Sequence, residues 1–437
     1  MFRQAASAER RGEVFSITEK SRINVITKSG VSNECQVNRK RMNMKDVVIV
    51  SAVRTAIGDF LGSLKDLTCI DLGVKVLKAA MEKASIDPKL IEEVVCGNPD
   101  MAGAKSNPGR QIAVHAGCPW ETVACTINQQ CVSSLRAAEI MYHELLLGKV
   151  EVGAVVGCAS MSNIPYLLMG ARTGVRMGNQ QIVDGMYNDG MMDAFYNILM
   201  GVTAENIVDM YSISRGEQDE FALMSHHRAC AAINNKTQAS ELVPVEIKTK
   251  KGAKIFDIDE HPRQGLTMED LAKLKPVFKK DGTVTAGNSS GINDGAAALV
   301  MMSLDKAKEL GIKPLARVVA TGSAAVDAKI MGMGVVPSVR RTLHFANLPM
   351  EAVDYWEINE AFAAQIIGCN RELKIPLEKL NGNGGGISLG HPVGMTGARL
   401  LVSLVHEMRR RGVRYGGASL CGGGGPATSM IVEAMYD

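Results

Sequence analysis

The chain has 437 residues, of which 22% are charged and 46% hydrophobic, a composition typical of a globular protein long enough for two or three domains. No stretch approaches the roughly 18 consecutive apolar residues of a membrane span, so we expect no membrane association. The net charge is +3, but residues 1–43 hold nine Lys and Arg against four Glu and therefore carry +5, which leaves −2 for the rest. A nearly neutral body gives no reason to expect nucleic-acid binding.

Residues 1–43 show no sustained apolar periodicity and lack the apolar core of a secretory signal. An organellar transit peptide is an alternative, but the four Glu count against it. Because Met42 and Met44 directly precede a strong strand pattern, we expect a disordered extension, or a segment upstream of the start, that carries no chemistry. The ten cysteines include no CxxC pair, which favours neither disulfides nor a metal site and suits a reducing, cytoplasmic compartment.

From residue 45 onward, short apolar strands alternate with amphipathic helices, and a similar order recurs from residue 315. This alternation predicts an α/β fold with a largely parallel, buried sheet, and the recurrence suggests an internal duplication. Residues 162–291 are rich in Met and Gly, which favours an inserted domain or lid. Strands are expected at 47–51, 94–97, 123–127, 152–158, 315–321, 353–358, 418–421 and 427–432, and helices at 70–84, 135–147, 339–346, 361–373 and 397–411.

One cysteine stands where a predicted strand passes into a predicted helix, in residues 128–135 (NQQCVSSL). A thiol at a helix N-terminus lies at the positive end of the helix dipole, which favours the thiolate. The backbone N–H groups of such a turn can also bind a developing oxyanion. Cys131 is therefore a candidate nucleophile, although a single turn of this kind is more often structural.

Three further junctions carry polar side chains. They are residues 383–394 (NGGGISLGHPVG) with His391, residues 419–426 (SLCGGGGP) with Cys421, and residues 359–363 (NEAFA) with Asn359. His391 could be a general base or a histidine in an ordinary turn, and Asn359 could hold a water or cap a helix. Because open α/β sheets gather ligand sites at strand ends, their convergence favours a catalytic cysteine.

These segments resemble the thiolase family, over nearly the whole chain from Met44 to the C-terminus. SAVRT at 51–55, MSNIPY at 161–166, MGVTAEN at 200–206, GTVTAGN at 282–288, NEAF at 359–362 and GHP at 390–392 follow in family order. The resemblance implies a five-layer αβαβα fold of two duplicated halves with an inserted loop domain. Residues 44–161 with 292–313 would form the N-terminal half, 162–291 the coenzyme A-binding loop domain, and 314–437 the C-terminal half. It also implies a homodimer or homotetramer.

The same resemblance implies thiolytic cleavage of a 3-ketoacyl-CoA, as in fatty acid metabolism, or the reverse Claisen condensation of acetyl-CoA. Cys131 would take the acyl group, and Cys421 would act as acid and base. His391 would activate Cys131 and, with a water held by Asn359, bind the thioester oxygen, while the N–H groups of Cys131 and Gly423 would form a second oxyanion hole. Coenzyme A would bind as a substrate, with no tightly bound cofactor. Positions matching its contacts are Arg263 beside the adenine, Ser290 and Ala286 along the pantetheine, and Phe278, Met200 and Phe362 on the apolar wall.

The chain departs from the family pattern at several positions. Ser134 stands where glycine is usual, Leu199 where short-chain biosynthetic members often have histidine, and Ala159 where glutamate is common. We expect the first two to alter the acyl pocket, which leaves the acyl group and the direction of reaction open. The alternatives are a ketoacyl-synthase-like condensing enzyme, which the Cys421 loop disfavours, and a non-catalytic acyl-CoA-binding member of the fold, which the intact catalytic set disfavours.

Overall fold

The structure is a computed structural model that describes residues 44–250 and 252–435. The expectation for residues 1–43 lies outside the described residues. Among the described helices, none combines the length and the hydropathy that crossing a membrane requires.

The first half alternates strands and helices as the sequence predicts. Helix α2 (Cys69–Lys83) begins at a reciprocal capping box between Thr68 and Asp71, and its regularly spaced apolar side chains are buried against the sheet. The other elements are β1 (Val47–Thr55), β2 (Gly58–Asp59), β3 (Glu93–Gly97), α3 (Pro108–His115), β4 (Val123–Ile127), α4 (Ser133–Leu146), β5 (Val152–Ser160), β11 (Asn293–Ser303) and α8 (Leu304–Glu309).

The second half repeats this order. Its strands lie in the order β13-β14-β15-β12, which corresponds to β3-β5-β11-β1 in the first half. An isolated bridge between Trp356 and Leu380 takes the place of β4, so α4 and α12 occupy equivalent positions and the predicted duplication is confirmed. The elements are β12 (Ala316–Ala325), α9 (Val335–Ala346), β13 (Tyr355–Ile358), α10 (Ala363–Leu373), α11 (Gly386–Leu389), α12 (Thr396–Arg411), β14 (Tyr415–Cys421) and β15 (Pro426–Ala434).

The prediction of a largely parallel sheet is wrong. β3 pairs in parallel with β4 and β5, and β13 with β14, whereas the other five neighbouring pairs along the sheet are antiparallel. Two neighbouring strands joined by a crossover helix are parallel because the helix returns the chain to the end of the sheet at which the first strand began. β11 enters only after the long insertion, and β15 follows β14 through a tight glycine turn, so neither is bound by that rule.

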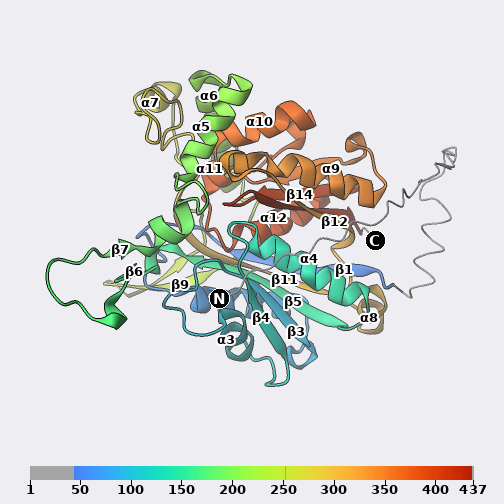
Figure 1. Cartoon of the computed structure of the whole chain (residues 1–437). Helices are drawn as coiled ribbons and strands as arrows, with labels where there is room; N and C mark the ends of the chain where they lie inside the picture. The colour runs from blue at the N-terminus through green and yellow to red at the C-terminus, as the bar shows by residue number, and fades with distance from the viewer. Residues whose placement is uncertain (1–43, 251, 436–437) are drawn as a thin grey trace, which may run out of the picture. The chain divides into compact units, whose positions relative to one another are not determined.

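Five layers stack within residues 44–435, as the prediction required (Figure 1). α2 and α3 cover the outer face of the first-half strands, and α9 and α10 lie on the outer side of the second-half strands. α4 and α12 lie between the two sets of strands and contact both. β1 and β12 connect the two sets through only two residue pairs. This arrangement brings the N-terminal turns of α4 and α12 to the centre of the molecule.

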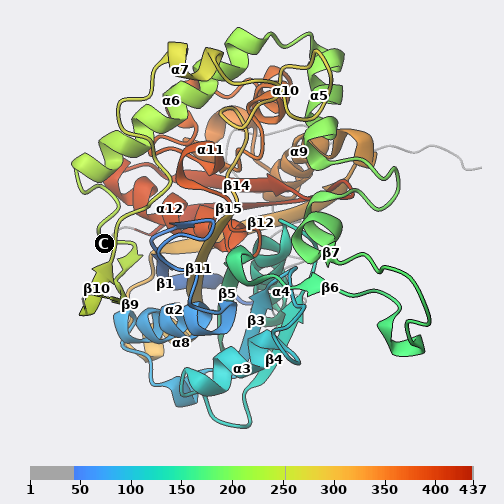
Figure 2. The same cartoon turned by 90° about the vertical axis from the view of Figure 1, so that its left-hand side faces the viewer.

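The helices of the insertion between β5 and β11 lie beside the second half, whereas its short strands lie next to the first half (Figure 2). α5 (Met200–Tyr211) and α6 (Arg215–Asn234) pack against α10, and α6 also contacts α11 and α7 (Met268–Ala272). β6 (Tyr166–Leu167) and β7 (Val183–Asp184) form the base of a projecting arm. β8 (Leu242–Val243) adds to β1, and β9 (Val245–Thr249) pairs with β10 (Gly252–Phe256).

Candidate active site

Cys131 lies in a tight turn between β4 and α4. The preceding residue, Gln130, has φ +52°, a left-handed conformation that turns the chain sharply before the helix. The Ser133 hydroxyl accepts a hydrogen bond from Gln129 N at 2.9 Å and donates to Gln130 O at 2.5 Å. These two bonds hold the turn, so the position of the Cys131 thiol is fixed by its neighbours in sequence.

His391 precedes α12 as Cys131 precedes α4, and the starts of the two helices touch. A Cβ atom added to Gly397 would lie 2.3 Å from the backbone nitrogen of Leu135, so only glycine permits this approach. The His391 backbone N–H donates to Asn293 Oδ1 at 2.9 Å, which anchors the loop to β11. The duplication therefore places the predicted nucleophile and the predicted base in the same central layer.

The hydrogen bonds of the His391 ring assign its tautomer. The Thr396 hydroxyl donates to the Pro392 carbonyl at 2.9 Å and lies 2.7 Å from His391 Nδ1. Because that hydroxyl has one hydrogen, it accepts from Nδ1–H, and Nε2 keeps its lone pair. Burial, with a smaller effect of the Arg399 charge, lowers the pKa of His391 to about 3. The ring is therefore neutral at physiological pH, with Nε2 available as a base.

Asn359 stands beside His391 at the end of β13. Its backbone N–H donates to Ser419 O at 3.0 Å, and its side-chain Nδ2 lies 3.5 Å from His391 Nε2. The residue is fully buried, and its Oδ1 has no hydrogen-bond partner. A buried amide oxygen without a donor is costly, so this atom is suited to receive a water or a ligand.

Cys421 and its glycine loop pack directly on the Cys131 turn. The Gly423 backbone N–H acts on the Cys131 thiol and by itself lowers the pKa of that thiol. Cys421 is buried, and burial followed by the neighbouring Cys369 and Cys131 thiols raises its pKa well above the ordinary value. The structure therefore brings together Cys131, His391, Cys421, Asn359 and Gly423.

The sequence predicts that the helix dipole favours the thiolate of Cys131, whereas in the structure the neutral thiol is favoured. Burial raises its pKa to about 12, and the nearby Asp100 carboxylate adds to the rise, whereas the N–H groups of Gly423 and Cys131 act in the opposite direction. Removal from water outweighs the helix dipole here. Cys131 is consequently a thiol at rest and needs a base to become a nucleophile.

Some of the residues predicted to contact coenzyme A belong to the apolar cluster of Cys421, and others are exposed. The rings of Phe278 and Phe362 meet edge to face, with centroids 6.1 Å apart, and Met200 belongs to the same apolar cluster as Cys421. The Ser290 N–H donates to Ala361 O at 2.9 Å. Ala286 and Arg263 are exposed, and the Arg263 N–H donates to His226 Nδ1 at 3.2 Å.

Ser134, which was expected to alter the acyl pocket, does not line the pocket described below. It is fully buried, and its Oγ accepts a hydrogen bond at 2.9 Å from the N–H of Ala398 in the first turn of α12. The hydroxyl thus caps an N–H that has no partner within the helix. Leu199 does stand directly before α5, next to Met200 of the pocket described below.

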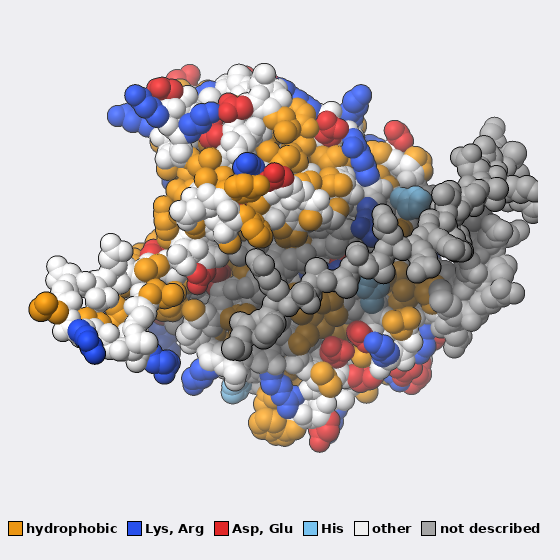
Figure 3. All heavy atoms as spheres, in the orientation of Figure 1, with side chains coloured by type: hydrophobic (Ala, Val, Ile, Leu, Met, Phe, Trp, Pro, Cys, Tyr) orange, Lys and Arg blue, Asp and Glu red, His pale blue; other side chains and the backbone are white. Residues whose placement is uncertain are grey.

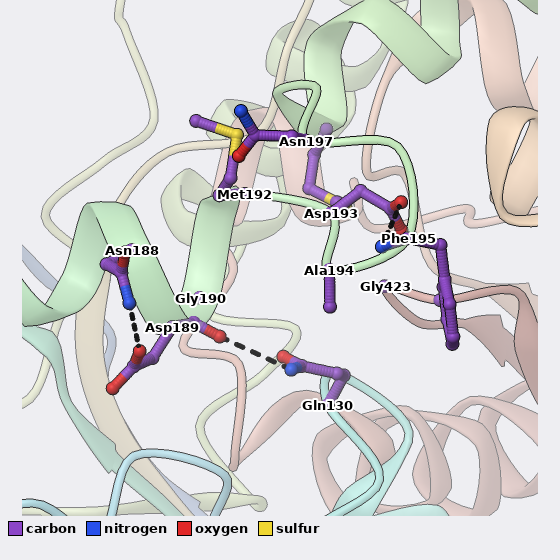
Figure 4. A pocket seen from close by; sticks show the side chains of 12 residues that line it. Gln130, Asn188, Asp189, Gly190, Met192, Asp193, Ala194, Phe195, Asn197 and Gly423 are labelled. Carbon is purple, nitrogen blue, oxygen red and sulfur yellow. Dashed lines mark hydrogen bonds between the residues drawn. The ribbon is translucent and has the colours of Figure 1, made fainter.

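A pocket of about 470 Å³ opens beside the catalytic turn, and sequence reasoning missed most of it (Figure 4). Gln130, Gly423, Gly424 and Met200 line it on the side of Cys131 and Cys421. The opposite wall comes from the insertion: Asn188, Asp189, Gly190, Met192, Asp193, Ala194, Phe195 and Asn197. Thr396 was missed as well. Its position five residues after His391, at the start of a predicted helix, is a signal that could have identified it.

Comparisons with known proteins agree with this geometry. Residues 47–305 match the family model described as "Thiolase, N-terminal domain", and residues 312–434 match "Thiolase, C-terminal domain". An acetyl-CoA acetyltransferase of Pseudomonas aeruginosa is 46% identical over 390 residues, 89% of this chain and 99% of that protein. A probable acetyl-CoA acyltransferase of Staphylococcus aureus is 45% identical over 391 residues, with the same coverage.

Solved structures give the same result. The acetyl-CoA acetyltransferase of Syntrophomonas wolfei superposes with a TM-score of 0.88 at 46% identity, covering 90% of this chain and 100% of that one. Human mitochondrial 3-ketoacyl-CoA thiolase superposes with a TM-score of 0.87 at 39% identity, covering 90% and 99%. Both halves of the chain and its insertion are thus accounted for, and the chain belongs to the thiolase family.

Proposed function

We propose that the enzyme transfers acyl groups between the sulfur of coenzyme A and the α-carbon of acetyl-CoA through an acyl-Cys131 intermediate. In this reaction it cleaves a 3-ketoacyl-CoA with free CoA or condenses acetyl-CoA in reverse. The observation that carries the proposal is a single site that holds the Cys131 turn, a neutral His391 whose free nitrogen is Nε2, and a buried Cys421 whose glycine loop packs on that turn. A non-catalytic acyl-CoA-binding protein would need none of these three.

In the first half-reaction, His391 Nε2 takes the proton of the Cys131 thiol as the sulfur attacks the thioester or ketone carbonyl. The resulting oxyanion is bound by donors at one of two places. One is formed by protonated His391 and a water held by the free Oδ1 of Asn359, and the other by the N–H groups of Cys131 and Gly423. Each such donor typically contributes about 3–4 kcal/mol to lowering the barrier.

Cys421 is assigned the proton transfers at the α-carbon. Its pKa lies well above the ordinary thiol value because of burial, so it is a thiol at rest and can protonate the acetyl-CoA carbanion formed in cleavage. In condensation the thiolate form removes the α-proton of the second acetyl-CoA. The carbanion then attacks the acyl-Cys131 carbonyl, the C–S bond breaks, and the α-proton passes from Cys421 to the leaving Cys131 thiolate, which returns Cys421 to its thiolate form.

Coenzyme A is proposed to lie along the path from Met200 and Phe362 through Phe278 to Ser290, Ala286 and Arg263. The apolar cluster would hold the pantetheine, and the exposed guanidinium of Arg263 would contact the nucleotide. We propose domain boundaries at 44–161 with 292–313, 162–291 and 314–437. The nine cysteines of the described residues are all free thiols, which supports a cytoplasmic location.

A homodimer or homotetramer is proposed on the basis of two exposed features. β4 is an edge strand of the sheet, and its first residue, Val123, is 62% exposed. The β6–β7 arm carries apolar side chains on its surface (Figure 3), which include Leu168, Met169, Met177 and Ile182. An unpaired edge and an exposed apolar arm are both suited to contact another copy of the chain.

The test measures the two half-reactions separately. Purified enzyme should release a shorter acyl-CoA from a panel of 3-ketoacyl-CoA substrates when free CoA is added. Cys421→Ser should slow the exchange of acetyl-CoA α-protons with solvent much more than the transfer of an acetyl group to Cys131. Equal losses in the two half-reactions would contradict the separate roles.

A further inference from the structure

The pocket beside Cys131 has an unusual charge distribution. Its lining includes the carboxylates Asp189 and Asp193 and no Lys, Arg or His. The side-chain amides at its edge are partly engaged already, since Gln130 Nε2 donates to Asp189 O at 3.3 Å and Asn188 Nδ2 donates to Asp189 Oδ1 at 2.6 Å (Figure 4). The pocket therefore offers negative charge and hydrogen-bond acceptors without a protein cation to balance them.

One carboxylate oxygen in the pocket wall, on Asp193, and one directly behind the wall, on Asp100, have no partner. Asp193 is 2% exposed; its Oδ1 accepts from Phe195 N at 3.0 Å and Tyr196 N at 2.8 Å, while its Oδ2 accepts nothing. Asp100 lies behind Gly190 of the pocket wall, where a Cβ on that glycine would be 3.8 Å from Asp100 Oδ1, and its buried Oδ2 is also unpartnered. Burying an unpaired carboxylate oxygen is costly unless a ligand supplies a donor or a positive charge.

Asp100 also acts against the reaction chemistry. It raises the pKa of the Cys131 thiol, and burial together with repulsion from Asp189 raises its own pKa to about 6. A carboxylate that opposes ionisation of the nucleophile has no role in the acyl transfer proposed above. A bound cation would relieve both the repulsion between Asp100 and Asp189 and the effect on the thiol.

We propose that this pocket receives the distal end of an acyl group that carries a protonated amine, and that Asp100 and Asp193 select it. The inference rests on the proposed acyl transfer to Cys131. Because the pocket begins at Gln130 and Gly423, which flank the nucleophile, it suits a short chain. In the loading step the Cys131 sulfur bonds to the acyl carbon, the bond from that carbon to the CoA sulfur breaks, and the thiol proton passes through His391 to the CoA thiolate.

The test uses acyl donors of matched chain length whose ends differ in charge. They are β-alanyl-CoA (ammonium), butyryl-CoA (methyl) and succinyl-CoA (carboxylate), with acetyl-CoA as the reference. The measurement is the initial rate of CoA release together with the mass of the acylated Cys131 peptide. The full-length enzyme should load β-alanyl about tenfold or more faster than butyryl, the effect of a partly desolvated charge pair, and succinyl most slowly.

Variants test the assignment to particular residues. Asp193→Asn keeps an oxygen for the N–H groups of Phe195 and Tyr196, and Asp100→Asn preserves the shape of the side chain. The ratio of β-alanyl to butyryl loading should therefore fall in each variant and fall furthest in the double variant. Asp305→Asn on the exposed face of α8 is the matched control and should keep the wild-type ratio. Faster butyryl than β-alanyl loading in the wild type, or an unchanged ratio in the double variant, would overturn the inference. Failure of all donors, acetyl-CoA included, would instead overturn the proposed function.

Discussion

Thr396 Oγ1 lies 2.7 Å from His391 Nδ1 and 2.9 Å from the Pro392 carbonyl, and these two contacts fix which imidazole nitrogen is free. Thr396→Val removes the acceptor, so the ring can adopt the tautomer in which Nε2 carries the proton. We expect kcat/KM for a 3-ketoacyl-CoA to fall about 10–100-fold, as for other histidines deprived of an orienting partner. Thr396→Ser keeps the hydroxyl and should restore most of the rate. Equal losses in both variants would contradict the role of the hydroxyl.

Stability should fall in acid because buried histidines resist protonation. Burial, followed by the charges of His261 and Arg263, lowers the pKa of His226 to about 4, below the value of about 6.5 in an unfolded chain. Between pH 6.5 and 4 the unfolded state therefore binds more protons, and the free energy of unfolding decreases as the pH falls. His226→Gln should remove on the order of 1–3 kcal/mol of that decrease in urea unfolding at pH 7.5 and 5. The control His115→Gln, at an exposed site of α3, should leave the pH dependence unchanged.

Activity should depend on the backbone conformation of the glycine loop after Cys421. A substitution that changes this conformation should lower activity much more than one that only adds a methyl group. Gly425 has φ +99°, and a Cβ there would lie 2.1 Å from Val326 O, so Gly425→Ala must reshape the turn and displace the Gly423 N–H. Loss of such a donor typically lowers kcat about 10²–10³-fold. In Gly423→Ala the nearest atom is the flexible Met200 Sδ at 3.3 Å and the N–H remains, so the loss should be much smaller. Equal losses, measured on acetoacetyl-CoA with folding checked by circular dichroism, would contradict this view of the second oxyanion hole.

Ser134 should contribute to stability and not to substrate choice. Ser134→Ala leaves the Ala398 N–H buried without a partner and should lower the free energy of unfolding by about 1–3 kcal/mol. The relative rates on 3-ketoacyl-CoA substrates of different chain length should stay as in the wild type. A shift in that chain-length profile would restore the original expectation that Ser134 shapes the acyl pocket.

The proposed catalytic set could be predicted from the sequence because its members lie in local motifs. Cys131, His391 and Cys421 each stand at the end of a strand or in a glycine-rich turn, and the fold gathers such ends at one place. Strand direction was not predictable in the same way, because β11 reaches its neighbours only after the insertion and no local pattern records that pairing.

The charged residues at the pocket could not be predicted from the sequence either. Asp100 and Asp193 are separated by 93 residues in the chain and look like ordinary polar positions in the sequence. Their unpartnered oxygens, and the effect of Asp100 on the Cys131 thiol, emerge only from packing. Ser134 illustrates the opposite error, since a departure next to the nucleophile in sequence points to α12 in space.

The central claim is that Cys131 carries the acyl group. The most direct measurement is peptide mass spectrometry of the enzyme incubated with acetyl-CoA and quenched in acid, which preserves the thioester. We predict one acetyl group on the peptide that contains Cys131, none in Cys131→Ala, and loss of thiolytic activity in that variant while its circular dichroism is unchanged. An acetyl group found on another residue, or undiminished cleavage by Cys131→Ala, would contradict the account.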